Sequence, residues 1–348
     1  SIATFFTNLW ATRSAWSWIV GISVGLVVVC QPAMTELLNW PFMALQGMCM
    51  SVGYLAAAAL LRTSRTERLT WAGIAVPLAL GYGSMHFFGA GLPISLGVIA
   101  AAVALLWLRR TEADRLWVSI GLIGFALIVT IGHAWFMLQS ETERAAGGLD
   151  ILVAVQRIGT LTSEMLRAAT VGMLSSQYQT PNVPAFPVQG AYGLGIWAIW
   201  LAVVVSMVIR AKNNRSSIGS ASIAVAVTVW MAAMLGSIVL RIRAEPDAAM
   251  LAYIMGTRYF LFVGMFAVVG LGAVVSLSWF AGPKRFAAGI GIVAATTSVA
   301  ASIVFWRVYA EQLWPHTLRS TTAYWSASLA SVKAELDAGR PAPLVDML

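Results

Sequence analysis

GLPISLGVIAAAVALLWLRR, residues 91–110, combines a long apolar run with an abrupt pair of arginines. No charged side chain interrupts the run before Arg109 and Arg110. A helix needs about 20 mainly apolar residues to cross the hydrocarbon core of a bilayer. The stretch therefore predicts a membrane-spanning helix over about 91–109 that ends at an arginine-bearing turn.

The composition of the whole chain agrees with this local signal. Of the 348 residues, 59% are hydrophobic and only 10% are charged, and the mean hydropathy is +0.80. Soluble domains carry roughly 25% charged residues, so this chain has too few charged residues to form a soluble surface. The apolar runs are too long for barrel strands, and helices satisfy their own backbone hydrogen bonds in lipid. The fold class expected is all-α, a polytopic transmembrane helical bundle.

Apolar runs of similar length recur from end to end, and we expect about nine spans. The expected spans lie at about 14–32, 40–61, 70–88, 91–109, 116–138, 191–210, 217–240, 258–281 and 286–306. An odd number of spans places the two termini on opposite sides of the membrane.

Basic residues concentrate in some of the turns between spans and avoid the others. The basic turns are 62–68 (RTSRTER), 109–115 (RRTEADR), 210–215 (RAKNNR) and 284–285 (KR). The short alternate loops, near 32–40 and 86–92, hold no basic residue. The positive-inside rule assigns the basic turns to the cytoplasm. We therefore expect a multi-pass membrane protein with its N-terminus inside, its C-terminus outside and an external working face.

The long segments expected outside divide the chain into four parts. These parts are N-terminal transmembrane helices (1–138), an external segment (139–190), C-terminal transmembrane helices (191–306) and an external C-terminal segment (307–348). Within the external segment, residues 150–177 show apolar residues at helical spacing interrupted by charges. This pattern predicts an amphipathic helix that lies on the membrane or packs across the mouth of the bundle, followed by a proline-rich loop.

The net charge of +8 would favour nucleic acid as a partner of a soluble protein. In this chain the charge reflects arginines that flank the spans, so membrane lipids are the expected partners and nucleic acid is not. Cys30 and Cys49 match no metal-binding or redox spacing and are expected to pack among apolar residues. No cofactor is expected.

An arginine cluster brackets one of the loops expected outside. In LRIRAEPDAAMLAYIMGTRYF, residues 240–260, Arg241 and Arg243 precede the loop, and Arg258 and Tyr259 open the next apolar run. Guanidinium groups bind phosphate through paired hydrogen bonds, so the cluster is a candidate site for a lipid phosphate or pyrophosphate. The alternative is that these side chains extend to ordinary headgroups.

The remaining candidates are one carboxylate and three histidines. Glu36, in the short loop TELLNWPF, is a candidate general base, although a solvated charge stabilised by the helix dipole is the favoured interpretation. His86, His133 and His316 occupy external ends of spans or the external C-terminal segment, where they could line one pocket. Because they lack metal-binding spacing, we expect no metal site and retain His86 as a substrate contact.

Three stretches of this sequence carry a resemblance to a known family: ELLNWPFMALQGMCMSVGYLAAAALL (36–61), FGAGLPISLGVIAAAVALLWLRR (88–110) and GTRYFLF (256–262). They resemble uncharacterised bacterial membrane proteins related to the GT-C glycosyltransferases, which implies the bacterial inner membrane as the location. The resemblance covers roughly 30–110 and 256–281. It implies transfer of a sugar from a polyprenyl-phosphate donor on the external face, with Arg258 at the donor phosphate and Glu36 as the nearby acid. The acidic motif of the family's first external loop is not seen, and the sequence is expected to begin after its place.

Two other functions remain open at this point. One is a transporter for a lipid-linked substrate, which wide cavities lined by polar residues would support. The other is an accessory subunit of a larger membrane complex, which suits the 15 tryptophans and large apolar surface. A pocket converging on Arg258, Glu36 and the helix at 150–177 would favour the enzyme.

Overall fold

The structure is a computed structural model that describes somewhat more than half of the chain. The described residues are 2–9, 15–29, 43–87, 91–141, 151–171 and 190–241, with isolated positions between 269 and 338. Residues 1–299 form one compact unit and residues 300–348 a second, in which the few described residues are all exposed. The described elements are helices joined by turns, with a single isolated β-bridge and no named strand, so the all-α class is confirmed for this part.

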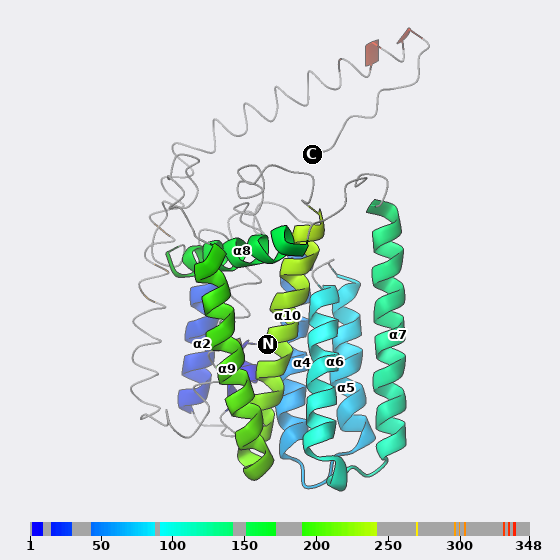
Figure 1. The fold of residues 1–348 in the computed structure, drawn as a ribbon, viewed down its shortest axis with the longest axis vertical. Helices are drawn as coiled ribbons and strands as arrows, with labels where there is room; N and C mark the ends of the chain where they lie inside the picture. Colours follow the sequence, from blue (N-terminus) through cyan, green and yellow to red (C-terminus); the bar gives the residue numbers. More distant parts are fainter. Residues whose placement is uncertain are drawn as a thin grey trace. The chain divides into compact units, whose positions relative to one another are not determined.

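The helices follow one another along the first unit (Figure 1). They are α1 (Ile2–Leu9), α2 (Ala15–Val29), α4 (Met43–Arg65), α5 (Trp71–Met85), α6 (Gly91–Leu108), α7 (Leu116–Glu141), α8 (Ile151–Val171), α9 (Gly190–Asn213) and α10 (Ile218–Arg241). Two short 3-10 helices, η2 (Arg110–Glu112) and η5 (Arg215–Ser217), lie in the turns.

Five of these helices are long and apolar enough to cross a membrane. The five segments are Leu45–Arg65, Gly91–Leu108, Leu116–Phe136, Gly193–Asn213 and Arg215–Val239. Expected spans 14–32 and 70–88 correspond to the shorter helices α2 and α5. The last two expected spans fall outside the described residues, apart from isolated positions. The chain is a helical membrane protein, and the count of about nine spans is not confirmed.

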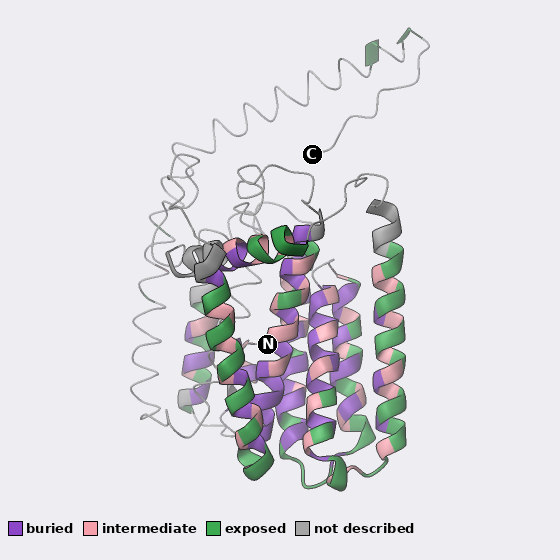
Figure 2. Cartoon of the chain, in the orientation of Figure 1, coloured by how far each residue is buried: buried purple, intermediate pink, exposed green. Residues whose placement is uncertain are grey.

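The buried core lies where α6 packs against α10 and α5, and α4 against α5 (Figure 2). Helices α6 and α10 approach each other closely at Gly97 of α6. A Cβ added there would lie 2.5 Å from Cδ1 of Trp230 and 2.6 Å from the carbonyl oxygen of Ala226. Lipid tails are as apolar as leucine, so helices in a membrane gain from close backbone packing of this kind. Glycine at residue 97 therefore sets the α6–α10 crossing.

Helix α7 packs against α5 and α6, and most of its surface is exposed (Figure 2). Two exposed tryptophans lie near its two ends: Trp117 is 81% exposed and Trp135 is 64% exposed. They are 18 residues apart (135 − 117), which is five full helical turns and about 27 Å. The hydrocarbon core is about 30 Å thick, and tryptophan prefers its two borders. These two residues therefore mark where α7 enters and leaves the hydrocarbon.

Helix α8 runs across the end of the bundle at which α9 begins and α10 ends (Figure 1). The amphipathic helix predicted over 150–177 is thus present, although residues 172–177 lie outside the described residues. Its fit against α9 requires Gly193, because a Cβ there would overlap the carbonyl oxygen of Gly159. The indole Nε1 of Trp197 donates a hydrogen bond of 2.8 Å to Oγ1 of Thr162. The first turn of α8 remains exposed.

Candidate functional site

The three described basic turns come together at one end of the bundle. We call this the arginine-turn end, and it consists of residues 62–70, 109–115 and 210–217. The opposite end contains the last turns of α5, α7 and α10, the first turn of α9, and α8. The two ends differ in chemistry, and each is described in turn.

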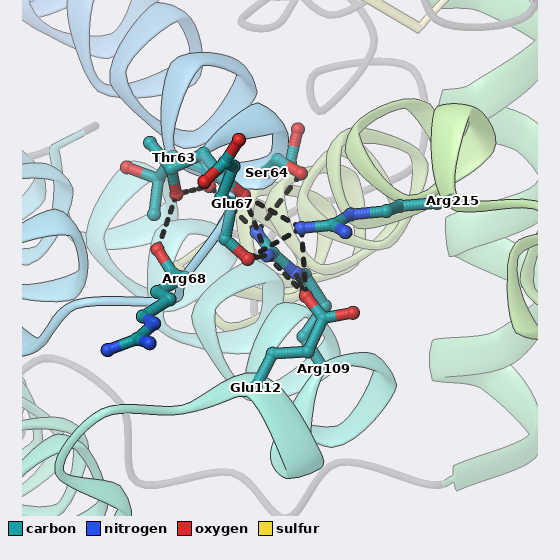
Figure 3. A network of polar contacts seen from close by, with 8 residues as sticks. Thr63, Ser64, Glu67, Arg68, Arg109, Glu112 and Arg215 are labelled. Atoms are coloured by element: carbon teal, nitrogen blue, oxygen red, sulfur yellow. Dashed lines mark hydrogen bonds and ion pairs between the residues drawn. The ribbon is translucent and has the colours of Figure 1, made fainter.

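Arg109 is the centre of the arginine-turn end (Figure 3). It follows α6, its side chain is fully buried, and it points at the carbonyl groups that end α4. Its Nη1 donates to the carbonyl oxygens of Thr63 and Ser64, both at 3.2 Å. Its Nη2 donates to those of Thr66 at 2.7 Å and Glu67 at 2.9 Å. The last carbonyls of a helix have no intrahelical partner, and the planar fork of this arginine supplies four donors at once.

Glu112 balances the charge of this buried guanidinium. Nε of Arg109 donates to Oε2 of Glu112 at 2.7 Å, and Nη2 of Arg109 forms an ion pair with the same oxygen. Arg215, just before α10, reaches the same point: its Nη2 lies 3.1 Å from that oxygen. Nη2 of Arg215 also donates to the carbonyls of Thr66 at 3.0 Å and Glu67 at 2.6 Å. One cluster therefore joins α4, α6 and α10 (Figure 3).

The backbone strengthens the same junction. Leu69 and Ala113 form a parallel β-bridge between the first two basic turns. The N–H of Leu69 donates to the carbonyl of Glu112 at 3.1 Å, and the N–H of Asp114 donates to that of Leu69 at 3.0 Å. Both turns are thus fixed relative to each other by hydrogen bonds that do not depend on side chains.

A third arginine acts in the same way on α1. The guanidinium of Arg65 donates to the carbonyl oxygens of Asn8 and, at 2.6 Å, Leu9, at the end of that helix. Cations stabilise helix C-termini because they pair with free carbonyls and with the negative end of the helix dipole. The sequence identified these turns as basic but did not show that Arg109 is buried, since the adjacent Arg110 has the same local signal.

The opposite end presents aromatic and imidazole side chains from two helices. His86 caps the C-terminus of α5, and its ring meets that of Tyr82 edge-on, with centroids 4.8 Å apart. His133 of α7 lies beside it, with the two imidazole centroids 6.2 Å apart. His86 and Tyr82 are exposed, and His133 is half-buried. Each imidazole can donate and accept hydrogen bonds, so this end offers a polar group to a ligand at the border marked by Trp135.

Most of the candidate site residues fall outside the part of the chain that the structure describes. Those outside it are Glu36, Arg243, Arg258, Tyr259 and His316. Arg241 is the last residue of α10, and its backbone places it at the opposite end. His86 is fully described and lies beside His133. Within the described residues, no group of three or more His, Cys, Asp and Glu side chains is placed to hold a metal ion.

The free cysteine of the described residues, Cys49, is buried in α4. This agrees with the packing role expected for it.

Comparison of the chain with protein-family models, with curated proteins and with solved structures gives no match.

The two ends differ in what they can do chemically. At the arginine-turn end, the guanidinium groups of Arg109, Arg215 and Arg65 are already bonded to helix carbonyls or to Glu112, so they serve to hold helices. At the opposite end, the side chains of His86 and Tyr82 are exposed, and their rings contact each other edge-on. The opposite end is therefore the candidate functional site.

Proposed function

We propose that the chain is a GT-C-like membrane glycosyltransferase that takes a sugar from a polyprenyl-phosphate carrier at the opposite end of the bundle. The proposal places the protein in the bacterial inner membrane. The arginine-turn end faces the cytoplasm and the site faces outward, with the N-terminus inside and the C-terminus outside.

The observation that carries this proposal is the position and surface of α8. This helix packs against α9 and α10 at the same end of the bundle that holds His86 and His133, and its first residues, Ile151 and Leu152, are 80% and 75% exposed. Exposed aliphatic residues on a helix that lies across a membrane protein's end suit the boundary between headgroups and hydrocarbon. A substrate that reaches its enzyme from within a leaflet needs such a boundary beside the reacting groups.

The residues proposed for the reaction are the candidates identified in the sequence. Arg258 binds the donor phosphate with Arg241 and Arg243, because a guanidinium matches phosphate through two parallel hydrogen bonds. Tyr259 and His86 contact the carrier or sugar, and Glu36 is the general base that takes the proton of the acceptor hydroxyl. The resemblance of residues 36–61, 88–110 and 256–262 to GT-C-related proteins supports the same assignment.

The test uses the purified full chain in lipid nanodiscs with polyprenyl-phosphate-linked sugars. Native mass spectrometry should show a bound polyprenyl phosphate, and Arg258→Ala should lose it while the unfolding temperature is unchanged. Arg258→Lys keeps the charge but lacks the fork and should bind more weakly. Retention of the carrier by Arg258→Ala would remove that residue from the site. Absence of any carrier and of sugar transfer in the wild-type protein would remove the function itself.

A second candidate function, an accessory subunit of a membrane complex, is favoured by α7. The exposed stripe between Trp117 and Trp135 contains Gly121, Gly124 and Gly132, and no described atom lies within 4 Å of a Cβ placed at any of them. Surfaces of this kind let another helix approach closely. A photo-crosslinking amino acid at Ile128 distinguishes the two functions, because a subunit should yield a stoichiometric protein adduct and a solitary enzyme should yield lipid adducts.

A further inference from the structure

The arginine-turn end keeps unpaired cations after its own helices have been secured. Four of its arginines have exposed side chains that form no hydrogen bond or ion pair with any described residue: Arg62, Arg68, Arg110 and Arg115. The exposed acids of the same surface are Glu67 and Asp114. The unpaired groups therefore carry an excess of positive charge.

The two exposed acids can neutralise at most two of these four arginines, and the remaining acid of the turns is held in the cluster beneath them. Glu112, the third acid of the turns, is already bonded to Arg109 and Arg215. The β-bridge between Leu69 and Ala113 holds the two turns that bear the four arginines side by side. The unpaired guanidinium groups are thus presented together from a fixed backbone.

The position of this surface relative to the hydrocarbon border of the membrane indicates which kind of anion it binds. Three exposed tryptophans begin or end helices beside it, Trp71 at the start of α5, Trp107 near the end of α6 and Trp117 near the start of α7. Exposed tryptophans prefer the border of the hydrocarbon core, so the turns beyond them lie among lipid headgroups. The Nζ of Lys212 lies 4.6 Å from the centre of the Trp107 ring, which holds a fifth cation at the same level.

We propose that the arginine-turn end selectively binds the headgroups of anionic phospholipids. The four arginines form a phosphate-binding surface, Lys212 on Trp107 marks its edge, and the cluster of buried Arg109 with Glu112 and Arg215 fixes its shape. Guanidinium groups hold phosphate through paired hydrogen bonds, and each basic residue near an anionic surface adds about a fivefold preference. This surface is separate from the site proposed for the carrier lipid.

The experiment compares the wild-type chain with two matched variants in vesicles of phosphatidylcholine with and without phosphatidylglycerol. One variant changes the four arginines to glutamine, and the other changes the same four to lysine, which keeps the charge. Wild-type protein should retain phosphatidylglycerol over phosphatidylcholine in native mass spectra. Its unfolding temperature should be higher in the anionic vesicles. In the glutamine variant, the preference for phosphatidylglycerol over phosphatidylcholine should fall by a factor of about ten or more. The lysine variant should keep most of this preference.

Two results would decide against the proposal, and a third would identify how the arginines bind. Equal retention of the two lipids by the wild-type protein would overturn it, and so would an undiminished preference in the glutamine variant. Loss of preference in the lysine variant as well would support binding through the guanidinium fork rather than through charge alone. A glutamine variant that unfolds in both vesicle types is set aside in favour of single substitutions at Arg110 and Arg115, whose preferences should each fall about fivefold.

Discussion

The two ends of the bundle are built by different interactions. At the arginine-turn end, one buried guanidinium, one carboxylate and a β-bridge join α4, α6 and α10. At the opposite end, the described contacts of α8 with α9 include a close glycine contact and an indole hydrogen bond, and imidazole rings of α5 and α7 lie side by side. Polar cross-links are costly to break, whereas packing contacts allow adjustment. We therefore expect the arginine-turn end to hold its helices more rigidly than the opposite end does.

The largest expected effect comes from removing the centre of the polar cluster. Arg109→Met should destabilise the protein by about 3–5 kcal/mol, because four carbonyls and Glu112 lose a buried partner. Arg110→Met, one residue away and exposed, is the matched control and should change stability little. Unfolding of both variants in nanodiscs would measure the difference. Equal losses would mean that burial of Arg109 contributes nothing beyond a surface charge.

A lysine at the same position sharpens the comparison. Arg109→Lys keeps the charge but offers three donors on a flexible stem instead of a planar fork. The variant should lie between wild type and Arg109→Met. Its position on that scale separates the contribution of charge from that of hydrogen-bond geometry.

The second effect concerns the opposite end, where packing replaces polar cross-links. Gly193→Leu places a side chain where the Gly159 backbone lies, and this overpacking should cost about 1–3 kcal/mol. Gly195→Leu is the control on the same helix, because no described atom lies within 4 Å of a Cβ placed there. Hydrogen exchange should rise in α8 of the first variant and stay low around Arg109. An increase across the whole bundle would show that the two ends are not independent.

The sequence predicted the helices better than it predicted the site. Apolar length was enough to place α4, α6, α7, α9 and α10, because a membrane leaves few alternatives to a helix. Helical spacing was enough to predict α8. Alternation of basic turns also indicated which turns share an end, as the bridge between Leu69 and Ala113 shows.

The contacts that join helices could not be read from the sequence, for physical reasons. Burial distinguishes Arg109 from Arg110, and burial depends on the position of the α4 terminus, 42–46 residues earlier in the chain. The approach of His133 to His86 likewise depends on how α7 packs on α5. Sequence spacing predicts metal or ligand sites only when the ligands share one element or one turn. Residues brought together from separate helices give no such signal.

The third effect is smaller and tests how α7 is attached. Oγ of Ser95 in α6 and Oγ1 of Thr130 in α7 lie 2.9 Å apart in a buried hydrogen bond. Thr130→Val should cost about 0.6 kcal/mol, the usual value for such bonds between membrane helices. Ser119→Ala on α7 is the control, since its buried hydroxyl has no partner among the described residues. Its removal should be neutral or slightly stabilising, so a greater loss at Ser119 than at Thr130 would contradict this account.

The smallest expected effect on stability should accompany a functional one. Phenylalanine at His86 or His133 keeps an aromatic ring at the α5–α7 contact, so either substitution should change stability by less than about 0.5 kcal/mol. If the proposed function holds, His86→Phe loses a hydrogen-bonding group and should raise the KM for the polyprenyl-linked donor several-fold, with little change in kcat. Trp135→Phe on the same end serves as the control for a purely interfacial change. An unchanged KM in His86→Phe, with sugar transfer intact, would mean that the contact between the two histidines serves packing alone. The substrate would then have to bind through the arginines near residue 258.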